Sequence, residues 1–200
     1  TDVYMSQDAG ATLHAAGLSI ASATSTNPLV EIKNTTNDVN SARLKLVKDK
    51  GAAGAANDDA GLIQFFADDA NQDQVMFSEI KSEVKVATNG QEGGKFTVSV
   101  AEHDGTSTAG LLIEDGDANG ELDVTIGAGT SSVLTVAGNA ITTANLSVGG
   151  SNNELRFFEG ANYVGFEAPA LSADKIWVLP AVDGSANQVL KTDGSGNLDW

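Results

Sequence analysis

The sequence contains no cysteine, and it is poor in aromatic residues, in proline and in positive charge. Without cysteine, a disulfide, a thiolate metal site and a thiol nucleophile are all excluded. Aromatic residues make up 6% of the chain, while its Ala, Val, Leu and Ile are interleaved with 22 glycines. This composition favours short strands and tight turns over a thick hydrophobic core.

The charge and the hydropathy pattern narrow the range of partners. The chain has 11 Lys and Arg against 27 Asp and Glu, a formal net charge of −16, which repels a nucleic-acid backbone. No apolar run approaches the ~20 residues of a membrane helix, and Thr1-Asp2-Val3-Tyr4 lacks the features of a signal peptide. We therefore expect no nucleic-acid partner and no membrane insertion. The start at Thr1 and the stop at Trp200 lead us to expect a piece of a longer chain.

Alternation of apolar and polar residues predicts half-buried strands at Leu44–Leu46, Phe96–Val100 and Leu122–Ile126. The segment 74–86 is ambiguous, because Met76, Ile80 and Val84 are spaced by four, as on a helix. Ile80 and Val84 also share a strand face, so we predict a strand. Hairpin and loop turns are expected at nine clusters: Asn57-Asp58-Asp59, Asn89-Gly90, Gly93-Gly94, Asp104-Gly105, Asp115-Gly116, Asn119-Gly120, Gly149-Gly150, Asp183-Gly184 and Asp193-Gly194.

The pattern divides the chain into four segments: an N-terminal β stalk segment (1–40), a β module (41–127), a narrow stalk or linker (128–150) and a C-terminal β module (151–200). Short strands leave many open edges, and three chains wrapped about an axis would pair those edges and merge their thin apolar faces. We predict an all-β, elongated, intertwined homotrimeric fibre built of β-hairpin modules. Isolated globular domains are the alternative. The predicted trimer core is Leu44, Leu46, Phe65, Phe96, Val98, Leu122, Val124 and Ile126.

Two stretches combine turn residues and large apolar residues in a characteristic order. The first runs from Leu155 through Phe157-Phe158-Glu159, Asn162-Tyr163-Val164-Gly165-Phe166, Leu179-Pro180 and Asp183-Gly184 to Gln188-Val189-Leu190 and Trp200. The second, less specific, spans Arg43 to Gly127 and includes Gly90-Gln91-Glu92-Gly93-Gly94-Lys95-Phe96. Both resemble tail-fibre and related virion proteins of bacteriophages, especially those of aquatic bacteria. The resemblance implies a trimeric fibre on the virion, outside the cell, with other virion tail proteins and a host-surface glycan or protein as partners. A bacterial extracellular adhesin or surface-filament subunit is the competing interpretation.

Catalytic motifs are scarce, and we predict no catalytic residues. The two histidines, His14 and His103, lie far apart in the sequence and read as loop residues. Glycan-cleaving modules use two carboxylates across a cleft, and the candidates for a polysaccharide depolymerase are Asp58-Asp59 and Asp68-Asp69. Both pairs lie in turn-rich segments without an aromatic groove, so an enzyme is the weakest of the three hypotheses.

The segment Asp115 to Asp123 reproduces the front half of a calcium loop, with Asp115, Asp117, Asn119 and Glu121 as the candidate ligands. Ile126 stands where the closing carboxylate would be. Two successive β-turns are the favoured alternative, and no cofactor other than calcium is indicated. The aromatic set Phe157, Phe158, Tyr163, Phe166 and Trp177 fits either a sugar-stacking surface or, more simply, a small β core.

Overall fold

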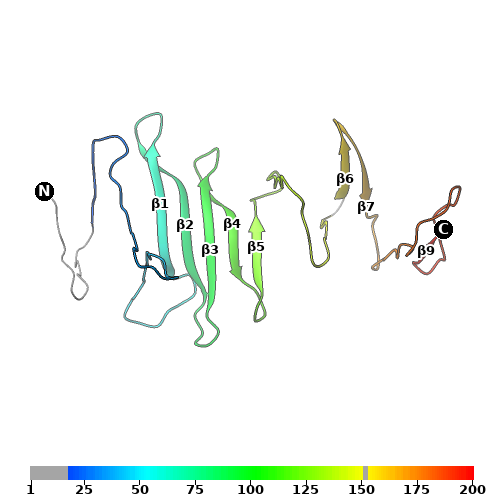
Figure 1. Ribbon diagram of the computed structural model, residues 1–200, viewed down its shortest axis with the longest axis horizontal. Helices are drawn as coiled ribbons and strands as arrows, with labels where there is room; N and C mark the ends of the chain where they lie inside the picture. The colour runs from blue at the N-terminus through cyan, green and yellow to red at the C-terminus, as the bar shows by residue number, and fades with distance from the viewer. Residues whose placement is uncertain (1–17, 151–152) are drawn as a thin grey trace. The chain divides into compact units, whose positions relative to one another are not determined.

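A computed structural model describes residues 18–150 and 153–200 of the chain (Figure 1). Every regular element in these ranges is a β-strand in an antiparallel sheet, and no helix is present there, so the all-β prediction is confirmed. Within the same ranges, nothing helical has the length and hydrophobicity needed to cross a membrane. The chain divides into two compact units, with the boundary between Thr135 and Val136.

The first unit contains a five-stranded antiparallel meander in the order β1-β2-β3-β4-β5 (Figure 1). The strands are β1 (Asp59–Asp68), β2 (Gln74–Val86), β3 (Gly93–Ala101), β4 (Ser107–Asp115) and β5 (Leu122–Ile126). The ambiguous segment 74–86 is a single strand of 13 residues, so the helical alternative is wrong. All five strands lie within the segment 41–127.

Glycine with a positive φ forms three of the expected hairpin turns. Gly90, Gly105 and Gly120 have φ angles of 79°, 83° and 86°, in a region that L-residues with a Cβ rarely adopt. The predicted turns at Asn89-Gly90, Asp104-Gly105 and Asn119-Gly120 are therefore confirmed. The prediction at Gly93-Gly94 was wrong, because these two residues begin β3 and pair with β2.

The β1–β2 turn depends on a carboxylate in place of glycine. The Oδ1 atom of Asp69 accepts the backbone N–H of Asn71 at 2.8 Å and that of Asp73 at 2.9 Å. An Asp side chain that accepts a hydrogen bond from the backbone two residues on forms an Asx-turn. The local chemistry of Asp69 is thus that of a turn residue.

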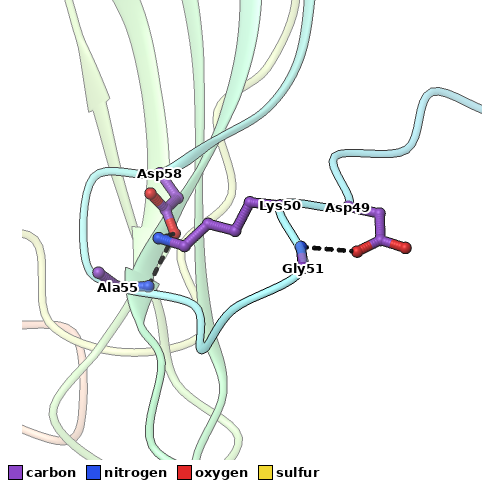
Figure 2. A network of polar contacts seen from close by, with 5 residues as sticks. All are labelled: Asp49, Lys50, Gly51, Ala55 and Asp58. Carbon is purple, nitrogen blue, oxygen red and sulfur yellow. Dashed lines mark hydrogen bonds and ion pairs between the residues drawn. The ribbon is translucent and has the colours of Figure 1, made fainter.

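The stretch 41–58 leads into β1 without forming a strand, so the strand predicted at Leu44–Leu46 is absent within a single chain. Figure 2 shows what holds this stretch: Nζ of Lys50 lies 2.7 Å from Oδ2 of Asp58, which also accepts the backbone N–H of Ala55 at 2.8 Å. Leu46 lies against Gly61 of β1, where an added Cβ would meet the Leu46 side chain at 3.1 Å. Leu46 therefore covers the start of the sheet.

The second unit contains two small antiparallel pairs. The hairpin of β6 (Glu154–Glu159) and β7 (Asn162–Glu167) turns at Gly160, which has a φ of 61°. The short strands β8 (Lys191–Thr192) and β9 (Leu198–Asp199) pair near the end of the chain. Nε1 of Trp200 donates a hydrogen bond to the carbonyl of Val182 at 2.7 Å, so the Trp200 side chain holds this terminal segment to the preceding loop.

Candidate functional site

The five-stranded sheet has one apolar face. In an antiparallel ladder, directly paired residues project to the same side of the sheet. The register pairs Ile80 with Val98, Val98 with Leu111 and Leu111 with Ile126, which makes a continuous apolar row across four strands. Neighbouring rows extend it, and we define the apolar face as Ile63, Phe65, Ile80, Val84, Phe96, Val98, Val100, Leu111, Ile113, Leu122, Val124 and Ile126. Ser78, Ser82, Thr108 and Asp115 are polar residues on this face.

The opposite face is mainly charged, and its ions are paired across the strands. The Glu83 carboxylate lies 3.0 Å from Nζ of Lys95 and 3.2 Å from Nζ of Lys81. A second pair joins Lys85 to Glu114 at 3.5 Å. The hydrogen bond from Lys95, followed by that from Lys81, holds the pKa of Glu83 below its ordinary value.

A few large apolar side chains share this second face with the ions. By register, Leu62 pairs with Lys81, and Leu112 pairs with Thr97 and Thr125. The charged face is therefore amphipathic at its β1 end and most polar over β2 and β3.

Burial is reversed relative to an ordinary domain. Glu83 and Thr97, both on the charged face, are buried, and each is 8% exposed. No hydrophobic residue of the described ranges is buried. On the apolar face, Leu122 is 69% exposed, Val124 57% and Phe65 50%. A single layer of sheet cannot hide an apolar face, because burial requires a second layer against it.

Burial of the apolar face would contribute a large stabilising free energy. Full burial of one aliphatic or aromatic side chain contributes roughly 2 kcal/mol. The more exposed members of the face are between about two-fifths and two-thirds open to water, namely Ile63, Phe65, Phe96, Val100, Leu122, Val124 and Ile126. Covering them would add about 7 kcal/mol per chain, as an upper estimate. That is comparable to the whole stability of a small domain.

The two outer strands leave open edges. Within residues 18–150, the outer side of β1 and that of β5 make no backbone hydrogen bond to another strand. Neither strand contains Lys or Pro, the residues that commonly protect an exposed edge from pairing with another chain. The sheet therefore has both an uncovered apolar face and two open edges.

The structure brings most of the predicted core residues together. Phe65, Phe96, Val98, Leu122, Val124 and Ile126 all belong to the apolar face, and Leu46 lies against Gly61 of the same sheet. Leu44 lies outside any strand and is 68% exposed. Val100 was expected on the apolar side of its strand, whereas Ile63, Leu111 and Ile113 belong to the face without having been predicted from the sequence. Their signal lay in the hairpin turns, because the turn positions determine which residues pair across strands.

The candidate calcium ligands do not converge. The Glu121 carboxylate accepts the backbone N–H groups of Asp117 and Ala118, each at 3.1 Å, while the Asp115 side chain lies against Gly93. Over the described ranges, no three Asp, Glu or His side chains are placed to hold one metal ion. Glu121 therefore acts as a turn acceptor in this conformation, in line with the alternative of two successive turns.

Three of the four candidate carboxylates, those of Asp58, Asp59 and Asp69, have local structural partners. Asp58 is held by Lys50 and Ala55, and these hydrogen bonds lower the pKa of its carboxyl, so it is ionised at neutral pH and is a poor proton donor. Asp59 lies 3.9 Å from Nζ of Lys81, and Asp69 stabilises the β1–β2 turn. These contacts stabilise the segment before β1, the β1–β2 pair and the turn between these strands.

The aromatic residues of the second unit do not form a core within one chain. Phe157, Phe158, Tyr163, Phe166 and Trp177 are all between 51% and 71% exposed.

Comparison of the chain with protein-family models, with curated proteins and with solved structures gave no match. The apolar face of the sheet and the resemblance of the sequence are therefore the observations that bear on function.

Proposed function

We propose that this chain is a structural, non-enzymatic segment of a bacteriophage tail fibre, in which three copies enclose their apolar faces in a common core. The observation that carries the proposal is the apolar face of a sheet that has no second layer in the described part of the chain. Such a face requires a cover, and a second and third copy of the same chain supply one of matching shape and chemistry.

The area of the face suits stable assembly. Five strands spaced about 4.8 Å apart give a width of roughly 24 Å, and nine-residue strands are ~30 Å long. The face therefore offers about 700 Å² per chain, close to the ~800 Å² that each partner contributes to a standard stable interface. Association through this face needs no further surface.

The width of the sheet favours three copies over two. Three sheets, each about 24 Å wide and arranged as a triangular prism, would place each sheet about 7 Å from the central axis, against ~5 Å in a two-sheet sandwich. The larger space suits Phe96, which lies on the central strand β3. A prism would also bring the open edge of β5 next to that of β1 in the neighbouring copy, whereas a sandwich leaves these edges apart.

The assignment to a phage virion depends on the sequence resemblance. In this role the chain works through its shape, as part of a stiff rod that spaces a receptor-binding tip from the particle, with other virion tail proteins as neighbours. A bacterial surface filament would use the same sheet in the same way. Recovery of the chain with purified virions, against recovery with the bacterial cell surface, distinguishes the two.

The mass of the purified chain in solution tests the proposal. Light scattering coupled to size-exclusion chromatography should give about 61 kDa, three times the chain mass of 20.4 kDa. Small-angle scattering on the same peak should indicate an elongated particle. A monomer that persists at all protein concentrations would contradict the proposal, because its apolar face would then be stable in water.

A further inference from the structure

The β6–β7 hairpin has two chemically different faces. Its register pairs Leu155 with Phe166 and Phe157 with Val164, which places all four on one side. We call this side the hairpin apolar side. Its members are 45% to 71% exposed, and the rings of Phe157 and Phe166 meet edge to face with centroids 6.3 Å apart.

The opposite side of the hairpin carries an ion pair and a cation–aromatic contact. Nε of Arg156 donates to the Glu154 carboxylate at 2.7 Å, and the Arg156 guanidinium lies 4.5 Å from the centroid of the Tyr163 ring. Tyr163 in turn packs beside Phe158, with ring centroids 5.4 Å apart. This side is compatible with water, because Arg156 is paired with Glu154 and covers part of the Tyr163 ring.

The hairpin receives no support from the other two strands of its own unit. Within the described residues of that unit, β6 and β7 contact each other and contact neither β8 nor β9. An isolated two-stranded hairpin is at best marginally stable in water, and it becomes stable when an apolar face is packed against another element. The four apolar side chains identify which side needs that packing.

We propose that the hairpin apolar side is a second self-association surface, whose occupant is the same side of the hairpins from the other copies of this chain. This inference rests on the proposed function, because it takes the copies to be held together by the sheet. Charge supports the choice of occupant: Glu154, Arg156 and Glu167 project from the opposite side, and the charged residue on the hairpin apolar side, Glu159, lies beside the turn, where it pairs with Asn162. The apolar side chains of like-charged copies can therefore meet while Glu159 stays at the rim of the contact.

The small area of the hairpin determines how this surface acts. Two six-residue strands present ~200 Å² per side, far below the ~800 Å² per partner of a stable interface. The hairpins therefore cannot join free chains. Once the sheets assemble, each hairpin is tethered to the others at an effective concentration in the millimolar range, which makes a weak surface sufficient. Hairpin order thus depends on sheet assembly, while sheet assembly does not depend on the hairpin.

Amide hydrogen exchange on the full chain tests the inference, read by mass spectrometry over a dilution series with the solution mass measured in parallel. The matched variants are Phe157→Asp and Phe158→Asp, adjacent in β6 on opposite sides, each losing one aromatic contact. In the wild type, we expect residues 154–167 to exchange at least about tenfold more slowly in the assembled state than in the dissociated one. Phe157→Asp should keep the assembled mass and lose this protection, whereas Phe158→Asp should keep both.

The outcomes separate this inference from the proposed function. A trimeric wild type whose hairpin exchanges freely at every concentration would overturn the inference and leave the proposed function standing. Protection that is independent of concentration would also overturn it, since the hairpin would then be covered by its own chain, and so would equal losses in the two variants. A wild type that is always monomeric contradicts the proposed function, and the mass alone reveals it.

Discussion

Val124 and Thr125 are adjacent on β5 and provide the sharpest test of the apolar face. Val124 belongs to the apolar face, while Thr125 pairs with Leu112 and projects to the charged face. Both residues are exposed in a single chain, and both are β-branched, so replacement by Asp removes the same strand preference at each position. The variants Val124→Asp and Thr125→Asp therefore differ chiefly in the face that receives the carboxylate.

The expected difference follows from the environment of each position in a trimer. Val124 is 57% exposed in one chain, so its own burial on assembly contributes about 1 kcal/mol. A carboxylate placed in the enclosed core adds a desolvation cost of at least ~3 kcal/mol per chain without a partner ion. The sum of about 4 kcal/mol corresponds to roughly a thousandfold weaker association for each copy. On the outer face, Thr125→Asp stays in water and should change association by less than about fivefold.

Sedimentation velocity over a hundredfold range of concentration measures this difference. The wild type and Thr125→Asp should sediment as trimers at micromolar concentration, and Val124→Asp as a monomer whose far-ultraviolet circular dichroism still indicates strand. Equal assembly of the two variants would refute the reasoning, because the apolar face would then not be the surface that copies share. Loss of assembly in Thr125→Asp alone would place the interface on the charged face.

Two further predictions concern the charged face and the turns. Because Lys95 and Lys81 lower the pKa of Glu83 in the folded state, the stability from this carboxylate is present above its unfolded pKa of about 4.3 and is lost as pH falls through the lower folded pKa. Glu83→Gln should therefore lower the unfolding free energy by about 1–2 kcal/mol at pH 7, as measured by urea denaturation. At a pH below the folded pKa of Glu83, the variant and the wild type should be equally stable. A difference that persists there would show that the ionised carboxylate is not the source of the stability. Asp69→Ala should destabilise the β1–β2 turn by about 1 kcal/mol, because it removes the acceptor of two backbone hydrogen bonds. Neither this variant nor the wild type should release reducing sugar ends from host polysaccharide. Release by the wild type that is lost in the variant would instead show that the chain is an enzyme.

The sequence predicted the parts of the sheet that local rules determine. Asn89-Gly90 and Asp104-Gly105 indicated turns correctly, because their glycines occupy a positive-φ region that few other residues adopt. The alternation at Phe96–Val100 and Leu122–Ile126 likewise assigned the apolar side of β3 and β5, since the strand period is two. These signals depend on a few neighbouring residues each.

The remaining features depend on pairing between distant residues. The run Leu111-Leu112-Ile113 has no alternation, so only its register against β3 and β5 assigns Leu111 and Ile113 to one face and Leu112 to the other. The pairing of β1 with β2 shifts between Phe65 and Phe66, which changes the face of the residues that follow. Gly93-Gly94 has the composition of a turn, and pairing with β2 makes it the start of a strand.

The charged face also bears on how far association can proceed. Each chain has a net charge of −16, and the ion pairs of Glu83 and Glu114 lie on the face that a prism would turn outward. The net negative charge of each chain would keep separate assemblies apart. The strands β1 and β5 are the first and fifth of an antiparallel meander, so they run in the same direction and can meet edge to edge between copies related by a rotation about a fibre axis. In the proposed trimer this rotation would close after three copies, which would hide the apolar faces and bring every open edge beside another, so that the sheet would not extend without limit.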